Sequence, residues 1–322
     1  MGELRITEKQ AQKLEIKAHS QLSPQLEKCC LLLSANASYA RAEEDIEVLT
    51  GIKVSHSTHQ RLVHQVQIPE QIATEEIEAI SIDGGKARIR TEKGDACVWR
   101  DYKAVNLDTK VVGAFFQENE ELIDWVKQQP LPDIFSCLGD GHDGIWNLFA
   151  AIGEENQRCE TLDWYHLVEN LYKTGLSDEQ KLEIKQLLWH GKFDETVDKL
   201  QSCQEQNVTN FLAYLSKHKS RIHNYDYFQC EGIPIGSGAV ESLVKQIDRR
   251  VQISGAQWNS KNLPQVLKQR SAYLNGYFSL SRNKHNYSLQ TGDAPLSNPQ
   301  SKLGSLKQYA IKSYYLTNVL CL

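Results

Sequence analysis

The sequence predicts an α/β fold in which a small sheet is flanked along the chain by helical regions. Residues 78–117 hold three segments with alternating apolar and polar positions, which is typical of strands. Residues 1–75 and 167–230 instead show the apolar periodicity of helices. The chain has 322 residues, of which 40% are apolar and 24% charged. This composition fits a folded protein with one to three domains and a substantial core.

The first 75 residues are predicted to be helical and to include a helix-turn-helix. An apolar-periodic segment ends at Gly51, and Ser55 is a suitable N-cap for a second helix that carries Ser57, Thr58 and Arg61. A glycine-containing turn followed by a helix that starts with short polar side chains is the outline of a DNA-binding motif. An ordinary pair of antiparallel helices explains the pattern equally well, so both interpretations remain open.

The central region alternates strands and helices in the order βββαβαβ. The helical segment 119–129 ends before Pro130, as expected for the residues that precede a proline. The expected strands are 78–90, 96–108, 110–117, 132–140 and 158–166, and the expected helices are 119–129 and 144–153.

Helix follows helix after this region, and we expect an all-helical insertion. A last helix begins near Ala239 and carries Glu241, Lys245 and Arg249 on one face, at i, i+4 and i+8. The predicted domains are a helix-turn-helix region (1–75), the first part of an α/β core (76–166) and an all-helical insertion (167–230). The rest of the core (231–280) and an irregular tail (281–322) follow.

Three acidic residues stand out by their positions. Asp83 lies within the first strand, Asp140 follows a buried strand, and Glu241 lies in the first turn of the late helix. Chemistry in α/β proteins gathers at strand ends and helix starts. Three carboxylates without Cys or His suit Mg²⁺ or Mn²⁺, and two such ions serve phosphoryl transfer. Each acid alone is more often structural, but the joint pattern is that of a ribonuclease H-like catalytic core.

The turn "CLGDGHDG" contains two candidate aspartates. Asp140 ends the strand and is predicted to be the metal ligand, whereas Asp143 is predicted to cap the following helix. His142 between them is an exposed turn residue for which neither a metal nor a phosphate role is favoured.

Basic residues gather late in the chain although the net charge is −5. From Lys245 to Asn286 there are eight Lys or Arg and one Asp. We expect Lys245, Arg249 and Arg250 to bind DNA phosphates near the catalytic site. A solvated charged face is the alternative.

Cysteine usage and terminal sequence indicate a cytoplasmic protein. The eight cysteines form no CxxC pair, which argues against a zinc ribbon and suits reduced thiols in a cytosol. No stretch has the length and apolarity of a membrane span or the pattern of a signal peptide.

Six ordered motifs resemble the ISKra4 family of transposases, which are DDE enzymes of bacterial insertion sequences. The motifs are "SIDGG", "CLGDGHDGIWNL", "LDWYHLVENLYK", "IPIGSGAVESLVKQIDRR", "ISGAQW" and "LPQVLKQRSAYLNG", within residues 40 to 278. The resemblance implies Asp83, Asp140 and Glu241 as the DDE triad and two Mg²⁺ (or Mn²⁺) ions as cofactors. It also implies double-stranded DNA as partner, at transposon ends and target, a homodimer or higher oligomer on DNA, and a nucleoid location.

The "DWYH" stretch is similar to a C/D-x-x-H signature of transposases with a helical insertion. By that resemblance Asp163 and His166 support the active site, while a buried Asp–His hydrogen bond is the structural alternative. Similar family members carry Cys-rich sequence before the helix-turn-helix, whereas this chain has only Cys29 and Cys30 there. We therefore expect a truncated or split reading frame.

Two other functions are compatible with the sequence. One is a catalytically idle or truncated DNA-binding protein derived from a transposase. The other is a ribonuclease H-like nuclease, against which the helical insertion and the helix-turn-helix both argue.

Overall fold

The computed structural model describes residues 7–13, 21–92 and 95–278, which form two compact units. The described residues of the first unit lie within 1–69, 86–100 and 246–282, and those of the second lie within 70–85 and 101–245. Strands β1 (Ala79–Ile89) and β2 (Val98–Leu107) and helix α12 (Gly238–Val251) contribute residues to both units.

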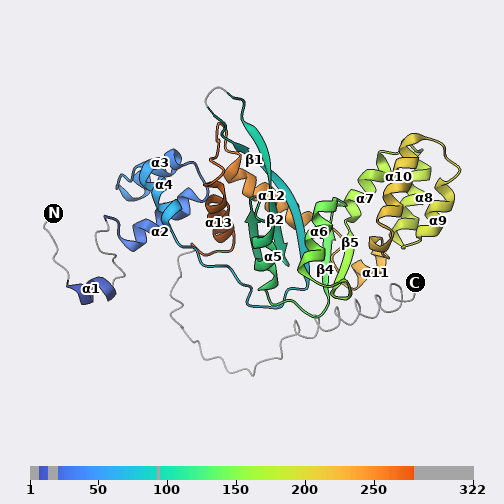
Figure 1. The fold of residues 1–322 in the computed structure, drawn as a ribbon, viewed down its shortest axis with the longest axis horizontal. Helices are drawn as coiled ribbons and strands as arrows, with labels where there is room; N and C mark the ends of the chain where they lie inside the picture. The colour runs from blue at the N-terminus through green and yellow to red at the C-terminus, as the bar shows by residue number, and fades with distance from the viewer. Residues whose placement is uncertain (1–6, 14–20, 93–94, 279–322) are drawn as a thin grey trace, which may run out of the picture. The chain divides into compact units, whose positions relative to one another are not determined.

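The first unit is built mainly from helices. Its helices, besides the end of α12, are α1 (Glu8–Lys13), α2 (Pro24–Ser34), α3 (Tyr39–Thr50), α4 (His56–Gln65) and α13 (Leu263–Leu274). Helices α2, α3 and α4 pack against one another around Cys30, Ile46 and Val54 (Figure 1). Gly51 ends α3 with a φ of 70°, and the Ser55 side chain caps α4. The predicted helix, turn and helix are thus confirmed as structure.

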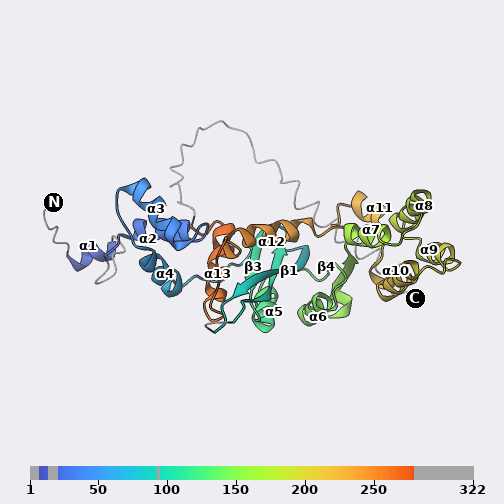
Figure 2. The ribbon, with the colours of Figure 1, turned by 90° about the horizontal axis from the view of Figure 1, so that it is seen from above.

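The second unit contains a five-stranded mixed sheet. Its other strands are β3 (Val111–Phe115), β4 (Phe135–Gly139) and β5 (Arg158–Leu162), and the sheet order is β3-β2-β1-β4-β5. β4 pairs in parallel with both β1 and β5, while β2 and β3 are antiparallel. Helices α5 (Asn119–Lys127) and α6 (Asp143–Ile152) pack together on the sheet (Figure 2). The predicted order βββαβαβ is confirmed.

The helices after β5 share the core of the sheet. They are α7 (Trp164–Tyr172), α8 (Asp178–Trp189), α9 (Phe193–Leu200), α10 (Gln206–Lys217) and α11 (Tyr225–Cys230), and α8 to α10 lie together in Figure 1. Leu188 and Phe211 belong to the same buried cluster as Leu162 of the sheet. Residues 167–230 belong to the same compact unit as most of the sheet, and their helices also pack against one another.

The end of β5 differs from the sequence prediction. β5 ends at Leu162 instead of continuing to residue 166, since Asp163 caps α7 and turns the chain into that helix. α11 lies at the end of the segment 167–230 that was predicted to be all-helical. The expected tail 281–322 lies outside the described residues. Within the described residues, no helix combines the length and apolarity needed to cross a membrane.

Candidate functional site

Strand register places three aspartates in one row, just past the paired residues of the parallel strands. The offset of 57 residues that pairs Ser81 of β1 with Leu138 of β4 also relates Asp83 to Asp140. The offset of 23 residues that pairs Gly139 of β4 with Leu162 of β5 relates Asp140 to Asp163. Parallel pairing thus brings Asp83 level with Asp140, and Asp140 level with Asp163, on neighbouring strands.

Each predicted triad carboxylate is held by a hydrogen bond within its own segment. Asp83 Oδ1 accepts from the Gly84 amide at 2.6 Å, and Asp140 Oδ1 accepts from the His142 amide at 2.9 Å. Glu241 Oε1 accepts from the Ser237 hydroxyl at 3.2 Å. One oxygen of each side chain is therefore oriented, and the second oxygen of each has no hydrogen bond to a described residue.

Asp163 connects the end of β5 to the start of α12. Its Oδ1 accepts from the His166 amide at 2.7 Å, which caps α7, and its Oδ2 accepts from the Ser237 amide. The Ser237 hydroxyl then donates to Glu241, and the amide of Trp164 donates to the carbonyl of residue 235 at 2.9 Å. Asp163 is completely buried, so its carboxylate fixes the chain segment that presents Glu241.

The carboxylates of the site repel one another, and His166 opposes that repulsion. Burial raises the pKa of Asp83, and the charges of Asp140 and Glu241 raise it further. Burial also acts against ionisation of Asp163, but hydrogen bonds from His166 and Ser237 bring its pKa below the usual value. The hydrogen bond and charge of Asp163 raise the pKa of His166 to about 9 despite burial, with smaller contributions from Asp140 and Glu241.

The acidic site fits a hard divalent cation. Within the described residues, no Lys or Arg forms an ion pair with Asp83, Asp140 or Glu241, so their negative charge is left for another cation. Carboxylate oxygens are the ligands that Mg²⁺ and Mn²⁺ prefer. An imidazole must be neutral to bind a metal.

A second potential ligand set overlaps the first. Asp163, His166 and Glu241 each offer one ligand atom, and these three atoms lie within 4.8 Å of one another. His166 is protonated at neutral pH because its pKa is about 9, and its Nδ1 lies 3.2 Å from Asp163 Oδ1. Among the described residues, ligand atoms of Asp83, Asp140 and Glu241 do not come this close together, so the predicted triad does not form a preorganised three-ligand site in the structure. The charge of His166 suits the Asp163–His166 pair to positioning Glu241.

Helix α10 lies against the turn that follows Asp140, a contact that no pattern in the sequence predicts. Gly141 has a φ of 99°, and a Cβ there would lie 3.0 Å from the Tyr214 hydroxyl and 3.4 Å from His218 Nε2. The turn therefore requires glycine for its conformation and has little room for a side chain. Tyr214 of α10 and His218, which follows that helix, thereby support the backbone next to Asp140.

Asp143 does not cap α6, which corrects the sequence prediction. The cap is His142, whose Nδ1 accepts from the Gly144 amide at 3.1 Å. Asp143 is the first helical residue, and its carboxylate pairs with Lys217 at 2.6 Å. Asp143 does lie at the positive end of α6, as predicted, but His142 makes the N-capping hydrogen bond.

The basic residues of α12 separate into two groups. Lys245 and Arg249 are exposed, as phosphate binding at a surface requires. Arg250 is 1% exposed, and its Nε donates to the carbonyl of Ser34 at 2.7 Å. Nine residues of α-helix make about two and a half turns. Arg250 therefore points away from the face of Glu241, which speaks against its predicted role at the catalytic site.

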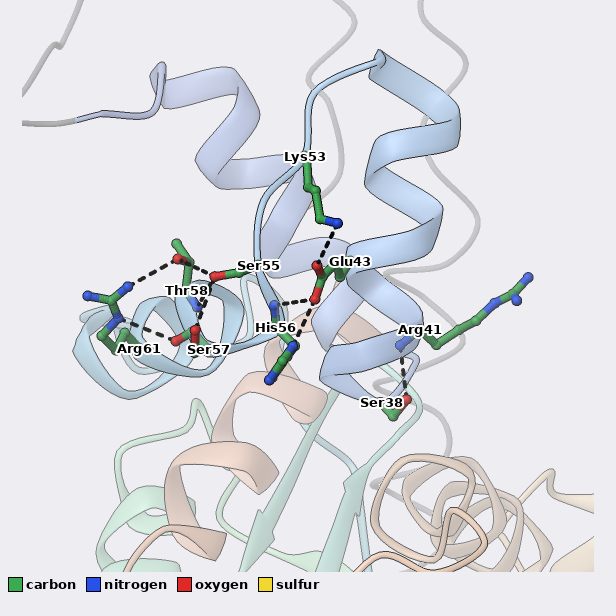
Figure 3. A network of polar contacts seen from close by, with 9 residues as sticks. All are labelled: Ser38, Arg41, Glu43, Lys53, Ser55, His56, Ser57, Thr58 and Arg61. Atoms are coloured by element: carbon green, nitrogen blue, oxygen red, sulfur yellow. Dashed lines mark hydrogen bonds and ion pairs between the residues drawn. The ribbon is translucent and has the colours of Figure 1, made fainter.

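The start of α4 presents polar side chains to solvent (Figure 3). Ser57 and Arg61 are exposed and Thr58 is half-buried. Arg61 folds back on its own helix, donating to the Thr58 hydroxyl at 3.1 Å and to the Ser57 carbonyl at 3.4 Å. The three residues predicted to contact DNA therefore form one polar cluster on the helix that follows the turn.

Comparison with known proteins gives no family, because no protein-family model and no curated protein matches the chain. The functional interpretation rests on the residues of the site and on their placement in the sheet.

Proposed function

We propose that the chain is a DNA transposase that cleaves and joins DNA strands with Asp83, Asp140 and Glu241 as its catalytic, metal-binding triad. The observation that carries this proposal is the register that sets Asp83 level with Asp140 on neighbouring parallel strands. Glu241 is held at the same site through Ser237 and the buried Asp163. The charges of Asp140 and Glu241 both raise the pKa of Asp83, after the larger effect of burial.

The fold supports a ribonuclease H-like core for this enzyme. The element order βββαβαβ, with acids on β1, after β4 and on a late helix, is the layout predicted from the sequence, and the strands form a sheet in the order β3-β2-β1-β4-β5. The helices between β5 and α12 occupy the place of the insertion in the transposases that the sequence resembles. Topology alone does not define an activity, so the carboxylates carry the functional proposal.

The residues around the triad have distinct roles in the proposed reaction. Two Mg²⁺ or Mn²⁺ ions held by the triad would supply an activated water and stabilise the leaving oxygen. Asp163 and His166 position Glu241, and the imidazolium charge of His166 reduces repulsion among the acids. Lys245 and Arg249 bind phosphates, and Ser57, Thr58 and Arg61 contact double-stranded DNA. The enzyme acts in the bacterial cytoplasm as a dimer or higher oligomer on DNA, since two transposon ends must be paired.

A DNA-binding protein without catalysis is the alternative that the exposed start of α4 favours by itself. It requires no metal and predicts DNA binding without strand cleavage. A ribonuclease H-like nuclease is the third alternative, and it predicts a preference for RNA–DNA hybrids over duplex DNA.

The variant Asp83→Ala tests the proposal with Asp101→Ala as matched control. Asp101 is an exposed aspartate of β2 outside the triad. Nicking of a supercoiled plasmid that carries the DNA flanking the gene is measured with Mg²⁺, with Mn²⁺ and with EDTA. We expect metal-dependent nicking that falls at least about 100-fold in Asp83→Ala and is unchanged in Asp101→Ala. DNA binding should be kept by both variants. Metal-dependent nicking retained in Asp83→Ala would overturn the assignment.

A further inference from the structure

The first unit contains a polar pocket that the proposed triad chemistry does not use. Its volume is about 490 Å³, and all of its lining residues belong to that unit. The walls come from the start of α3, the second half of α4, the residue after β1 and the segment from Arg250 to Asn262. The pocket lies within the range of volumes that hold small organic ligands in proteins.

The lining of this pocket is cationic. It includes Arg90 and Arg250, and it includes no Asp or Glu. His64 also lines the pocket, but burial lowers the pKa of its imidazole, so it adds a polar group and not a charge. Side chains that can donate hydrogen bonds surround these groups, among them Ser38 and Asn262. The absence of acids is unusual in a chain with 41 acidic residues and a net charge of −5. The pocket is therefore built for an anion.

Arg250 is a buried cation without an anionic partner. Its guanidinium lies 5.2 Å from the ring centre of Tyr39 and 5.0 Å from that of Trp258. Its Nε donates to the carbonyl of Ser34, whereas its Nη2 has no hydrogen-bond partner among the described residues. No described carboxylate forms an ion pair with this guanidinium. Burial lowers the pKa of Arg250 accordingly. Because a buried charge is costly unless it is paired, an anion in the pocket would supply the missing partner.

Trp258 fixes the backbone at Arg90 and lies beside the guanidinium of Arg250. Its indole Nε1 donates to the carbonyl of Val251 at 2.7 Å, directly after Arg250. Its backbone amide donates to the carbonyl of Arg88 at 2.8 Å, and its own carbonyl accepts from the amide of Arg90 at 2.8 Å. The backbone at Arg90 and the aromatic wall beside Arg250 are thus fixed to one residue, which preorganises the site.

We infer that this pocket binds a phosphate group, with Arg90 and Arg250 as its cationic contacts and Trp258 as its aromatic wall. Planar guanidinium groups bind phosphate oxygens in a bidentate manner, and a tryptophan beside them suits a nucleotide base. Phosphate of this kind is supplied by a DNA strand or by a free nucleotide. The DNA source rests on the proposed function, whereas the phosphate chemistry of the pocket does not.

The test uses Arg90→Gln with Arg100→Gln as matched control. Both arginines are exposed and lie in the first unit, but only Arg90 lines the pocket. Both changes are made in an Asp83→Ala background with EDTA, so that cleavage does not interfere. Binding of a fluorescent single-stranded 12-mer and of a duplex is followed by anisotropy over a range of salt concentrations, and dAMP and inorganic phosphate are added as competitors.

Arg90→Gln should weaken binding of the single-stranded probe about tenfold and reduce the salt slope by about 1, with Arg100→Gln close to the parent. A second readout avoids dependence on one variant: binding should change tryptophan fluorescence in the parent but not in Trp258→Phe. If dAMP displaces the fluorescent probe at the same phosphate concentration as the oligonucleotide, the pocket is a free-nucleotide site. If only unlabelled oligonucleotide displaces the probe, the pocket is a DNA-strand site.

Equal affinities of Arg90→Gln and Arg100→Gln, with a fluorescence change that persists in Trp258→Phe, would overturn the phosphate pocket. That result is independent of the triad, because nicking by protein with Asp83 intact is measured separately. Loss of the triad assignment with a positive Arg90 result would leave a phosphate-binding protein of another function.

Discussion

The Asp163–His166 pair gives a pH dependence that can be worked out from the structure. Protonated His166 stabilises the folded state at pH values below its ordinary pKa of 6.5, and this stabilisation is lost as pH rises through the folded-state value of about 9. A pKa difference of about 2.5 corresponds to about 3.4 kcal/mol. The side chain is 33% exposed, so solvent screening reduces the expected contribution to about 2 kcal/mol.

The variant His166→Gln isolates this contribution. Urea unfolding of the parent and the variant is measured with EDTA at several pH values from 6 to about 10. We expect the variant to be less stable by about 2 kcal/mol near pH 6, and the difference to shrink towards zero above the folded-state pKa of about 9. The other titrating groups are common to both proteins and cancel in the difference. A difference that stays constant over this pH range would refute the charged pair, and only a packing role for His166 would remain.

The site and the sheet give two more predictions, each with a neighbouring residue as control. Asp140→Ala should abolish metal-dependent nicking, whereas Asp143→Ala should retain it with nearly unchanged stability because that exposed carboxylate only pairs at the surface; inactivity of Asp143→Ala alone would show that the wrong aspartate was chosen. Gly85→Ala should lower the free energy of unfolding by about 1–3 kcal/mol, since the new Cβ would lie 2.2 Å from the Tyr102 ring. Gly84→Ala, with a nearest contact of 3.5 Å, should unfold at the same urea concentration as the parent, and equal effects of both changes would contradict the close packing.

The order of strands and helices along the chain was predictable because alternation and helical periodicity are local properties of the sequence. The overextension of β5 shows the limit of that signal. The stretch "LDWYH" continues an apolar pattern, but the capping bond of Asp163 decides where the strand ends and the helix begins. The DGG of residues 83–85, which by itself suggests a hairpin bend, lies inside β1.

Parts of the candidate site depend on contacts that no local pattern encodes. The packing of Tyr214 and His218 against Gly141 joins residues more than 70 positions apart. The opposite case is Arg250, whose placement could have been predicted. Arg250 follows Glu241 by nine residues, which puts it on the other side of the helix. Arg249 follows Glu241 by eight residues and therefore lies on the same face as Glu241.

The buried carboxylate of Asp163 explains how a long helical segment can stand between two parts of one site. Asp163 lies where the helical segment leaves the sheet, and Ser237 lies where the chain returns from it. Ser237 donates one hydrogen bond to Asp163 and another to Glu241, which connects Glu241 to the end of the sheet. The position of Glu241 is thus set at the base of the segment and not by its outer helices. Gly236 supports this closure, since a Cβ there would lie 2.7 Å from the Tyr165 ring.

The entropy of closing a chain segment grows only slowly with its length. The outer helices α8 and α9 can therefore change in length at modest cost, provided that the Asp163–Ser237 contact and the α10 contacts at Gly141 are kept. Loss of Asp163 removes the shared anchor of His166 and Ser237, so it should affect the placement of Glu241 more than any single change in the outer helices.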